Sequence, residues 1–343
     1  MSRSRFDRPM GWLPDSGDII GYHANGFPIY LPHGGVAGIG VDEWVPEEWE
    51  GRVIQRVNQM SAVEARSNRI PMRNDVKHVP RSSGVGVESV PKGGTYGEDL
   101  SANDSVLLTA RKIGKIIRID QEDLLDSTAV NIIATKKVDW ATSYAKFLDN
   151  ATLAVTAAEN GTTVPFTSLY RSLRTTNADT SYTADDNHLV SAGAVSYDEL
   201  SEVLSYVEEG DYWSDGDMYV IAHPGFRRVL REIKDSQLRP IFVGGQGGDR
   251  GTPDTVFDVP IHYSLGAKTH PTATDAPTGN PLMFIGNMRY IDLGIRSGPE
   301  SAAAGADTGP AFTSDQHLLK MRSRRGWAVA HEKAFGVLEK TAS

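Results

Sequence analysis

Hydrophobic and polar positions alternate with a period of two along several stretches of the chain and follow a helical period along others. Between Val76 and Ile119 the pattern predicts an outgoing strand at 76–90 and a returning strand at 105–119, joined by the Gly-rich segment 91–97. The apolar residues of this hairpin are sparse, and its tip is rich in glycine. A hairpin of this composition cannot form a core by itself, so we expect it to project from the body or to lie on another protein.

Downstream of the hairpin, the spacing of apolar residues predicts a long helix with Asp120 as its N-cap. One apolar stripe with helical spacing runs along this helix. The stripe consists of Val130, Ala134, Val138, Ala141, Ala145 and Leu148. Ile133, Trp140, Tyr144 and Phe147 widen it. We expect this helix to be the spine of the fold, because it is the longest element that the pattern predicts.

An alternation of helices and strands follows and predicts a compact α/β lobe. Ser196 and Glu199 have the spacing of a capping box at the start of a helix. The segment 218–222 has the composition of a buried strand, and Pro224 suits the first position of the next helix. The later predicted strands are 256–264, 282–295 and 316–321. Between the last two, 297–313 is rich in Gly and Ala and is predicted to be a loop.

The first 50 residues are punctuated by Gly and Pro and are predicted to form an extended arm. Within this arm, Asn25-Gly26 is a type I′ turn signal between two short apolar stretches, which predicts a small hairpin. Trp44 and Trp49 are large apolar residues in polar surroundings. Such residues commonly anchor a segment on another surface, here either the body or a neighbouring subunit.

Composition and charge narrow the function classes. The net charge of -9 argues against nucleic-acid binding by the surface as a whole, and the absence of cysteine excludes disulfides, thiol catalysis and cysteine-based zinc sites. The charge is uneven: residues 1–50 hold three basic and eight acidic residues, whereas 66–118 hold ten basic and five acidic ones. These two regions could pair between copies of the chain, or both could be solvated surfaces without a partner. No apolar window of about 18 residues is present, so no transmembrane helix and no secretory signal are expected.

A search for catalytic and ligand-binding motifs is mostly negative. The glycines of 244–251 are not followed by Lys-Ser or Lys-Thr, so a phosphate-binding loop is not expected. The nine histidines show no metal-ligand spacing. Glu122, Asp123 and Asp126 could hold a cation or act in acid–base chemistry, but carboxylates in the first turns of a helix are explained by its dipole. We therefore expect no catalytic, cofactor-binding or metal-binding residue.

Six segments occur in a specific order over residues 50–340. They are 111–127 (RKIGKIIRIDQEDLLDS), 149–153, 230–241, 256–261, 284–287 and 322–338. In this order they resemble the major capsid protein family of tailed bacteriophages, which has the Hong Kong 97-like capsid fold. Each segment is degenerate alone, and the resemblance depends on their succession.

The resemblance implies an α+β architecture with an N-arm, an E-loop hairpin, a peripheral domain that contains the long spine helix, and an axial domain. The implied boundaries are 1–50 for the N-arm, 51–70 for the first part of the peripheral domain, 71–105 for the E-loop, 106–155 for the peripheral domain with the spine helix, 156–285 for the axial domain, 286–325 for the peripheral-domain strands and 326–343 for the return to the axial domain.

The resemblance also implies a function. The chain would be a structural subunit without enzymatic activity that assembles into pentamers and hexamers of an icosahedral phage head, enclosing double-stranded DNA without sequence-specific binding. Its location would be the virion capsid, after assembly in the host cytoplasm. Its partners would be further copies of itself, a portal, a separate scaffold and a minor capsid or decoration protein. The alternatives are an encapsulin-like compartment shell and a soluble α/β enzyme that uses the carboxylates of 122–126.

Two sets of residues are expected to form contacts between subunits. In the E-loop and its base they are Lys77, Arg81, Lys92, Arg111 and Lys112. In the N-arm they are Trp44, Glu47, Glu48, Trp49 and Glu50. The first set would meet acidic surfaces of neighbours, and the second would supply carboxylates and apolar anchors.

Some members of the resembled family also crosslink an E-loop Lys to an Asn of the peripheral domain. Lys77 and Lys92 are available for such a bond, but 297–321 contain no Asn, and Asn287 is the nearest alternative. We therefore expect no covalent crosslink and a shell held by overlapping arms, a minor capsid protein or both.

Overall fold

The computed structural model divides the chain into two units, Met1–Gly51 and Arg52–Ser343. The described residues are 19–22, 28–30, 60–82, 84–98, 104–126, 131–234, 237–239, 241, 255–274, 276–305 and 314–341. In the first unit, β1 (Ile19–Tyr22) pairs antiparallel with β2 (Pro28–Tyr30), which confirms the predicted small hairpin. The Asn25-Gly26 turn lies outside the described residues.

The second unit contains a four-stranded sheet with the order β3-β12-β13-β6. Its strands are β3 (Asn68–Pro71), β12 (Ile291–Ala304), β13 (Gln316–Val329) and β6 (Arg111–Asp120). β13 is antiparallel to both β12 and β6, whereas β3 is parallel to β12. The loop predicted over 297–313 is wrong for residues 297–304, which belong to β12. Pairing with β13 here outweighs the weak strand propensity of Gly and Ala.

A six-stranded sheet in the same unit has the order β7-β14-β11-β8-β10-β9. Its strands are β7 (His188–Ala192), β14 (Phe335–Thr341), β11 (Leu282–Asn287), β8 (Met218–Ala222), β10 (Val259–Tyr263) and β9 (Thr255–Val256). The single strand predicted over 256–264 is instead the hairpin β9–β10. Its two turn residues, Phe257 and Asp258, have φ values of 49° and 64°, as a type I′ turn requires.

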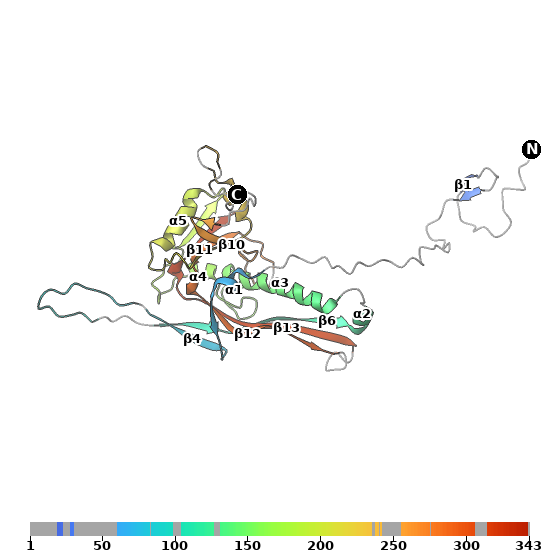
Figure 1. Ribbon diagram of the computed structural model, residues 1–343, viewed down its shortest axis with the longest axis horizontal. Helices are drawn as coiled ribbons and strands as arrows, with labels where there is room; N and C mark the ends of the chain where they lie inside the picture. Colours follow the sequence, from blue (N-terminus) through green and yellow to red (C-terminus); the bar gives the residue numbers. More distant parts are fainter. Residues whose placement is uncertain are drawn as a thin grey trace, which may run out of the picture. The chain divides into compact units, whose positions relative to one another are not determined.

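Two connections carry the chain between these sheets (Figure 1). The first is η2 (Met288–Tyr290), which separates β11 from β12, so the single strand predicted over 282–295 is wrong. The second is η4 (Glu332–Ala334), between β13 and β14. The side chain of Asn287 caps η2: its amide donates to the carbonyl oxygen of Tyr212 at 2.9 Å, and its oxygen accepts from the amide of Arg289 at 3.0 Å.

Helices cover both faces of the six-stranded sheet. On one face, α5 (Tyr197–Glu208) and α6 (Phe226–Glu232) pack their apolar sides onto a cluster that includes Val220 and Ile285. On the other face, α4 (Leu169–Leu173) and the C-terminal part of α3 (Ile132–Leu153) pack onto a cluster that includes Phe284. The capping box of α5 is confirmed. α6 begins at Phe226, two residues later than predicted, because Pro224 and Gly225 form a turn.

The single helix predicted from Asp120 is two helices in the structure. Asp120 ends β6, α2 (Gln121–Asp126) follows it directly, and α3 begins after Asn131. The side chain of Asn131 accepts a hydrogen bond from the amide of Ala134 at 3.0 Å and thus caps α3. The last turns of α3 face α1 (Ala62–Arg66), which the side chain of Ser61 caps.

The apolar stripe predicted along α3 is half wrong. Ala145 and Leu148 are buried as expected, but Ala134, Val138 and Ala141 are exposed. We refer to the six-stranded sheet with its covering helices as the lobe. The buried positions of α3 concentrate in its last 12 residues, from Thr142 to Leu153, where the core of the lobe surrounds the helix. The first half of α3 extends along the four-stranded sheet without being enclosed (Figure 1).

Candidate functional site

A hairpin projects from the second unit at the end of the four-stranded sheet opposite to α2 (Figure 1). Its strands are β4 (Val76–Arg81) and β5 (Asp104–Thr109), which pair antiparallel from Val76–Thr109 to Arg81–Asp104. Beyond Arg81 the described part of the loop contains no strand, so the outgoing strand predicted over 76–90 ends nine residues early. Gly84 has a φ of 85°, a left-handed conformation that interrupts an extended strand.

The returning strand predicted over 105–119 is also divided. Ala110 separates β5 from β6, and the two strands belong to different sheets. The backbone amide of Ala110 donates to the carbonyl oxygen of Asp75 at 2.7 Å. This bond closes the hairpin where its strands meet the four-stranded sheet.

Arg81 fastens the outer end of the hairpin strands. Its guanidinium forms an ion pair with the carboxylate of Asp104, and Nη1 donates to the carbonyl oxygen of Ala330 at 2.6 Å. The hydrogen bond from Arg81 lowers the pKa of Asp104 below its ordinary value. Only 16% of the Arg81 side chain is exposed. Arg81 therefore joins the hairpin to the connection between β13 and β14.

Three further contacts hold the inner end of the hairpin. The carboxylate of Asp75 forms ion pairs with Arg296, at 3.0 Å, and with Arg324. The ammonium of Lys77 donates to the carbonyl oxygen of Pro71 at 3.0 Å. The hairpin is thus attached at both ends of its strands, and its loop is held away from the body.

Arg111 connects the start of β6 to the lobe. Its Nη2 donates to Glu159 Oε1 at 2.6 Å, and its guanidinium lies beside Gly161, where an added Cβ would meet it at 3.2 Å. Arg111 thus has a partner within its own chain. Lys92 in the loop and Lys112 on β6 are exposed. Trp44, Glu47, Glu48, Trp49 and Glu50 lie outside the described residues.

The loop of the hairpin, residues 84–98, carries exposed apolar side chains. Val85, Val87 and Tyr96 are 77%, 98% and 81% exposed. Glu88 and Glu98 lie on the same loop and are also exposed. Side chains of this size and exposure, gathered on one projecting loop, are typical of a surface that another protein covers.

A second surface lies on the face of the four-stranded sheet where every other residue of β6 is exposed. Lys112, Ile116 and Arg118 point to this face, and Ile116 is 56% exposed. In the neighbouring strand β13, Lys320 lies directly opposite Ile116, and Leu318 lies opposite Arg118. We refer to these five residues as the outer sheet face. The sequence contains this alternation, but the site prediction included only Lys112.

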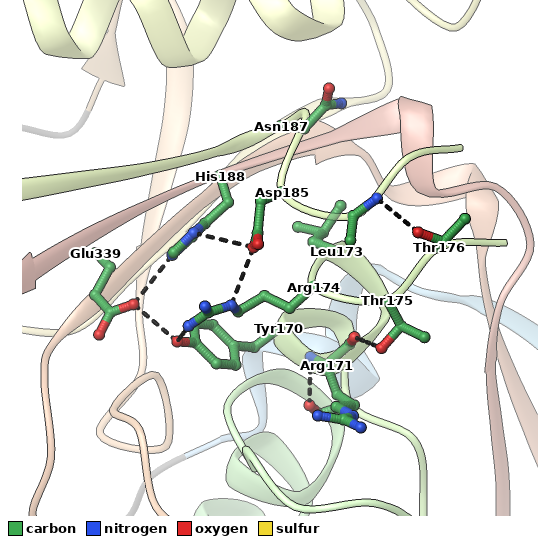
Figure 2. Close-up of polar contacts among 12 residues, drawn as sticks. Tyr170, Arg171, Leu173, Arg174, Thr175, Thr176, Asp185, Asn187, His188 and Glu339 are labelled. Atoms are coloured by element: carbon green, nitrogen blue, oxygen red, sulfur yellow. Dashed lines mark hydrogen bonds and ion pairs between the residues drawn. The ribbon is translucent and has the colours of Figure 1, made fainter. Parts of the chain in front are cut away.

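A polar network of the lobe is shown in Figure 2; it is buried around His188 and Glu339 and reaches the surface at Arg174 and Asp185. Glu339 accepts hydrogen bonds from Tyr170 Oη at 2.8 Å and His188 Nε2 at 3.0 Å, and it also accepts from Asn280. Asp185 pairs with Arg174 at 3.0 Å and lies 3.5 Å from the other ring nitrogen of His188. These groups satisfy one another and join α4, β7 and β14. The sequence did not predict this network, because its members are up to 169 residues apart along the chain.

Neither a metal centre nor a membrane span is recognisable in the part of the chain that the structure describes. Within these ranges, no group of three or more His, Asp or Glu side chains could hold a metal ion. Glu122 and Asp123 are exposed in the first turn of α2, as the helix-dipole interpretation requires. Among the described helices, none is both long and apolar enough to cross a membrane.

Comparison with known proteins gives a consistent result. The family described as the phage capsid family matches residues 43–340. A chain of Gordonia phage Cozz is 17% identical, with 90% of this chain and 95% of that chain covered and a TM-score of 0.65. A chain of Mycobacterium phage Bobi is 15% identical, with 88% and 98% covered and a TM-score of 0.64. A chain from the capsid of a native GTA particle is 12% identical, with 89% and 99% covered and a TM-score of 0.66. No curated protein matches.

Proposed function

The chain belongs to the phage capsid family, and on this premise we propose that it forms the pentamers and hexamers of an icosahedral phage head around double-stranded DNA. It is a capsid structural protein of the virion, and the similar structures confirm the capsid fold predicted from the sequence. Assembly in the host cytoplasm, the absence of sequence-specific DNA contacts and the absence of enzymatic activity are parts of the proposal.

The observation that carries this proposal is the exposed apolar loop of a firmly attached hairpin. Val85, Val87 and Tyr96 cannot be covered by the hairpin itself, because its two strands end at Arg81 and Asp104. The contacts of Arg81 and Asp75 keep the hairpin base attached to the body. A subunit that must contact its neighbours would use such an arm, since each contact between many copies adds to the stability of the whole assembly.

We propose that the loop of one copy docks on the outer sheet face of the next. The loop offers Val87 and Tyr96 with the carboxylates of Glu88 and Glu98, and the outer sheet face offers apolar Ile116 and Leu318 among cations. These cations are Lys112, Arg118 and Lys320. Charge complementarity would set the register of the contact. The loop and the outer sheet face are different surfaces of the chain, so the contact is head-to-tail, and such contacts form a ring where the rotation between copies closes.

The predicted contact residues then fall into two roles. Lys92 and Lys112, which are exposed, would touch a neighbouring subunit directly. Lys77, Arg81 and Arg111, which have partners within the chain, would hold the hairpin and β6 in position for that contact. Trp44, Glu47, Glu48, Trp49 and Glu50 remain proposed contacts of the N-arm.

The division of the chain predicted from the resemblance is part of the same proposal. Residues 1–50 would be the N-arm, and 71–105 would be the E-loop. The peripheral domain would comprise 51–70, 106–155 and 286–325, and the axial domain would comprise 156–285 and 326–343. A portal, a separate scaffold and a minor capsid or decoration protein would be the partners. We propose no covalent crosslink, and the amide of Asn287 is already bonded to Tyr212.

A direct test is assembly of the purified chain, followed by electron microscopy. The wild type should form closed shells. The double variant Val87→Asp, Tyr96→Asp should fold with an unchanged melting temperature but remain as small oligomers, because both changes fall on exposed positions of the loop. The control is Val190→Asp, which places one such charge on an exposed strand residue of the lobe. Normal shells from the double variant would refute the docking role of the loop.

The alternative of an encapsulin-like compartment shares the fold, and no observation on this chain favours it. The two hypotheses differ in what the shell encloses. Particles isolated from infected cells should contain nuclease-protected double-stranded DNA if the chain forms a phage head. Particles filled with a cargo enzyme and free of DNA would instead support the compartment.

A further inference from the structure

A cavity of about 390 Å³ lies between α3, the start of α6 and the loop that follows β10. Lys146 of α3 and Arg227 of α6 line it, together with Tyr263 and the apolar side chains of Met60 and Leu265. The guanidinium of Arg227 lies over the ring of Tyr263, with its carbon 4.4 Å from the ring centroid. Stacking of this kind orients a guanidinium and leaves its N–H groups free to donate in the plane.

The carboxylate in the floor of the cavity is not available to these cations. Asp149 is fully buried and accepts hydrogen bonds from the hydroxyls of Ser61 and Ser264. It also accepts from the backbone amides of Ala62, at 3.1 Å, and Val63, at 3.4 Å. Both of its oxygens are therefore occupied.

The cavity consequently presents unused hydrogen-bond donors. In the part of the chain that the structure describes, neither Lys146 nor Arg227 forms an ion pair, whereas the adjacent Arg228 pairs with Glu232. Lys146 and Arg227 carry only donor groups. A ligand that fits this lining must be an anion with acceptor oxygens. The volume is larger than one such group needs, so the ligand also brings apolar atoms toward Met60 and Leu265.

A surface of opposite charge lies on the other half of the same lobe. α5 covers the part of the six-stranded sheet formed by β7, β14 and β11, away from the cavity. Asp198, Glu202 and Glu209 follow one another at helical spacing on the exposed side of this helix and its C-cap. Glu202 contacts Tyr206, but none of the three carboxylates has a cationic partner among the residues described.

We propose that the cavity is an anion-binding pocket and that its ligand is a carboxylate from α5 of a second copy of this chain. The pocket and α5 lie on different halves of one lobe, so the contact is head-to-tail and can repeat around a ring. Glu202 and Glu209 are the residues that supply the carboxylate, and it accepts hydrogen bonds from the pocket. The apolar part of their side chains fills the remaining space beside Met60 and Leu265. This inference rests on the proposed function, since it adds a second contact between the same subunits.

Charge exchange tests the pairing. One variant carries Lys146→Glu and Arg227→Glu, a second carries Glu202→Lys and Glu209→Lys, and a third carries all four changes. The control is Lys136→Glu with Lys137→Glu, which alters the exposed half of α3 by the same charge. The readout is the protein concentration at which shells appear in sedimentation, with circular dichroism melts to verify folding.

Each two-residue reversal should raise that concentration by about tenfold, as expected for the loss of a close charge pair. The four-residue variant, in which every copy carries the exchanged charges, should assemble nearly as well as the wild type. If the first variant does not fold, Lys146→Gln with Arg227→Gln replaces it and should show the same loss of assembly.

Three results would overturn the inference. The four-residue variant could assemble no better than either reversal, or the control could be equally damaging. The pocket variant could also form shells normally but lose affinity for a fluorescent single-stranded oligonucleotide, which would assign the pocket to nucleic-acid phosphate instead. If the wild type forms shells and both reversal variants assemble equally well, the inference fails but the proposed function stands. If the wild type forms no shell even when the proposed scaffold is present, the proposed function itself is refuted.

Discussion

Arg81 and Asp104 pair across the last register position of the β4–β5 hairpin, and the same guanidinium donates to the carbonyl oxygen of Ala330 at 2.6 Å. Ala330 lies in the connection from β13 to β14, which links the four-stranded and six-stranded sheets. One side chain therefore ties the projecting loop to the segment between the two sheets. This contact fixes the outer end of the hairpin strands, whereas the ion pairs of Asp75 and the buried Leu108 of β5 fix the inner end.

The variant Arg81→Met should release the hairpin without unfolding the protein. Methionine keeps the apolar stem of the arginine but removes both polar contacts. Backbone amides of β4 and β5 should exchange with deuterium faster than in the wild type, and proteases should cut the loop sooner. The thermal unfolding midpoint should change by no more than about 2 °C, since the core is untouched.

The control for this experiment is Arg228→Met. Arg228 forms an exposed i, i+4 ion pair with Glu232 on α6, and pairs of this kind contribute little. Its removal should leave the exchange of the hairpin amides unchanged. If the amides of β4 and β5 were equally protected from deuterium exchange in Arg81→Met and wild type, the contacts of Arg81 would not be needed to hold the hairpin.

Glu339 should make the stability of the lobe depend on pH in the acid range. Burial opposes its ionisation, but the hydrogen bonds from His188, Asn280 and Tyr170 outweigh burial and lower the pKa of Glu339 to about 2, from an ordinary value of 4.5. The folded state therefore binds a proton less readily than the unfolded state. The stabilisation is complete above about pH 4.5 and is lost as the pH falls toward 2, with a magnitude on the order of 3 kcal/mol.

Urea denaturation of the wild type and of Glu339→Gln over this pH range measures the effect. The variant should be less stable than the wild type at neutral pH, and the difference should shrink as the pH approaches about 2. Glu122→Gln, which changes an exposed carboxylate on α2, is the matched control and should follow the wild type. If the unfolding free energies of wild type and Glu339→Gln changed in parallel with pH, the lowered pKa of Glu339 would not be the source of the pH dependence.

The two halves of α3 should respond differently when an apolar side chain is shortened to alanine. Leu148→Ala removes a fully buried side chain at the core of the lobe and should cost about 2–5 kcal/mol of unfolding free energy. Val138→Ala alters a side chain that is 38% exposed and should cost about 0.5 kcal/mol or less. Chemical denaturation of the unassembled subunit compares them. A large loss of unfolding free energy in Val138→Ala would instead support the continuous apolar stripe predicted from the sequence.

Local signals in the sequence were sufficient for the elements that depend on nearby residues. The capping box of Ser196 and Glu199 and the small N-terminal hairpin are confirmed, because each depends on contacts within a few residues. The strand at 218–222 is also confirmed, because its continuous apolar run suits a strand that is buried between two others. The helical period also identified α3, but it could not show that only one end of the helix is enclosed. That depends on the position of sheets made from residues far along the chain.

The errors have the same physical origin. Residues 297–304 have little strand propensity, and they form β12 only because β13 pairs with them. Arg81 and Arg111, which stay predicted contact residues, have partners within the chain that the sequence could not show, because only the fold brings Asp104 and Glu159 within reach of them. The pairing of the outer sheet face across β6 and β13, and the network around Glu339, likewise require residues that the sequence separates by more than a hundred positions.

Close contact between β11 and β14 leaves no room for a side chain at Gly286 in the lobe core. A Cβ at this position would overlap the ring of Phe335 and lie 2.5 Å from the carbonyl oxygen of Ala334, so backbone and a buried aromatic would both have to move. Gly286→Ala should therefore destabilise the subunit by about 1–3 kcal/mol or more, the range of overpacked cores.

The matched substitution is Gly216→Ala, where an added Cβ has no atom within 4 Å. It should leave the unfolding free energy unchanged within about 0.5 kcal/mol. Both variants should be measured by urea denaturation of the unassembled subunit, so that contacts between copies do not compensate for a strained core. If Gly286→Ala were as stable as Gly216→Ala, β11 and β14 could separate without cost, and the lobe could not hold the Glu339 network in the arrangement described above.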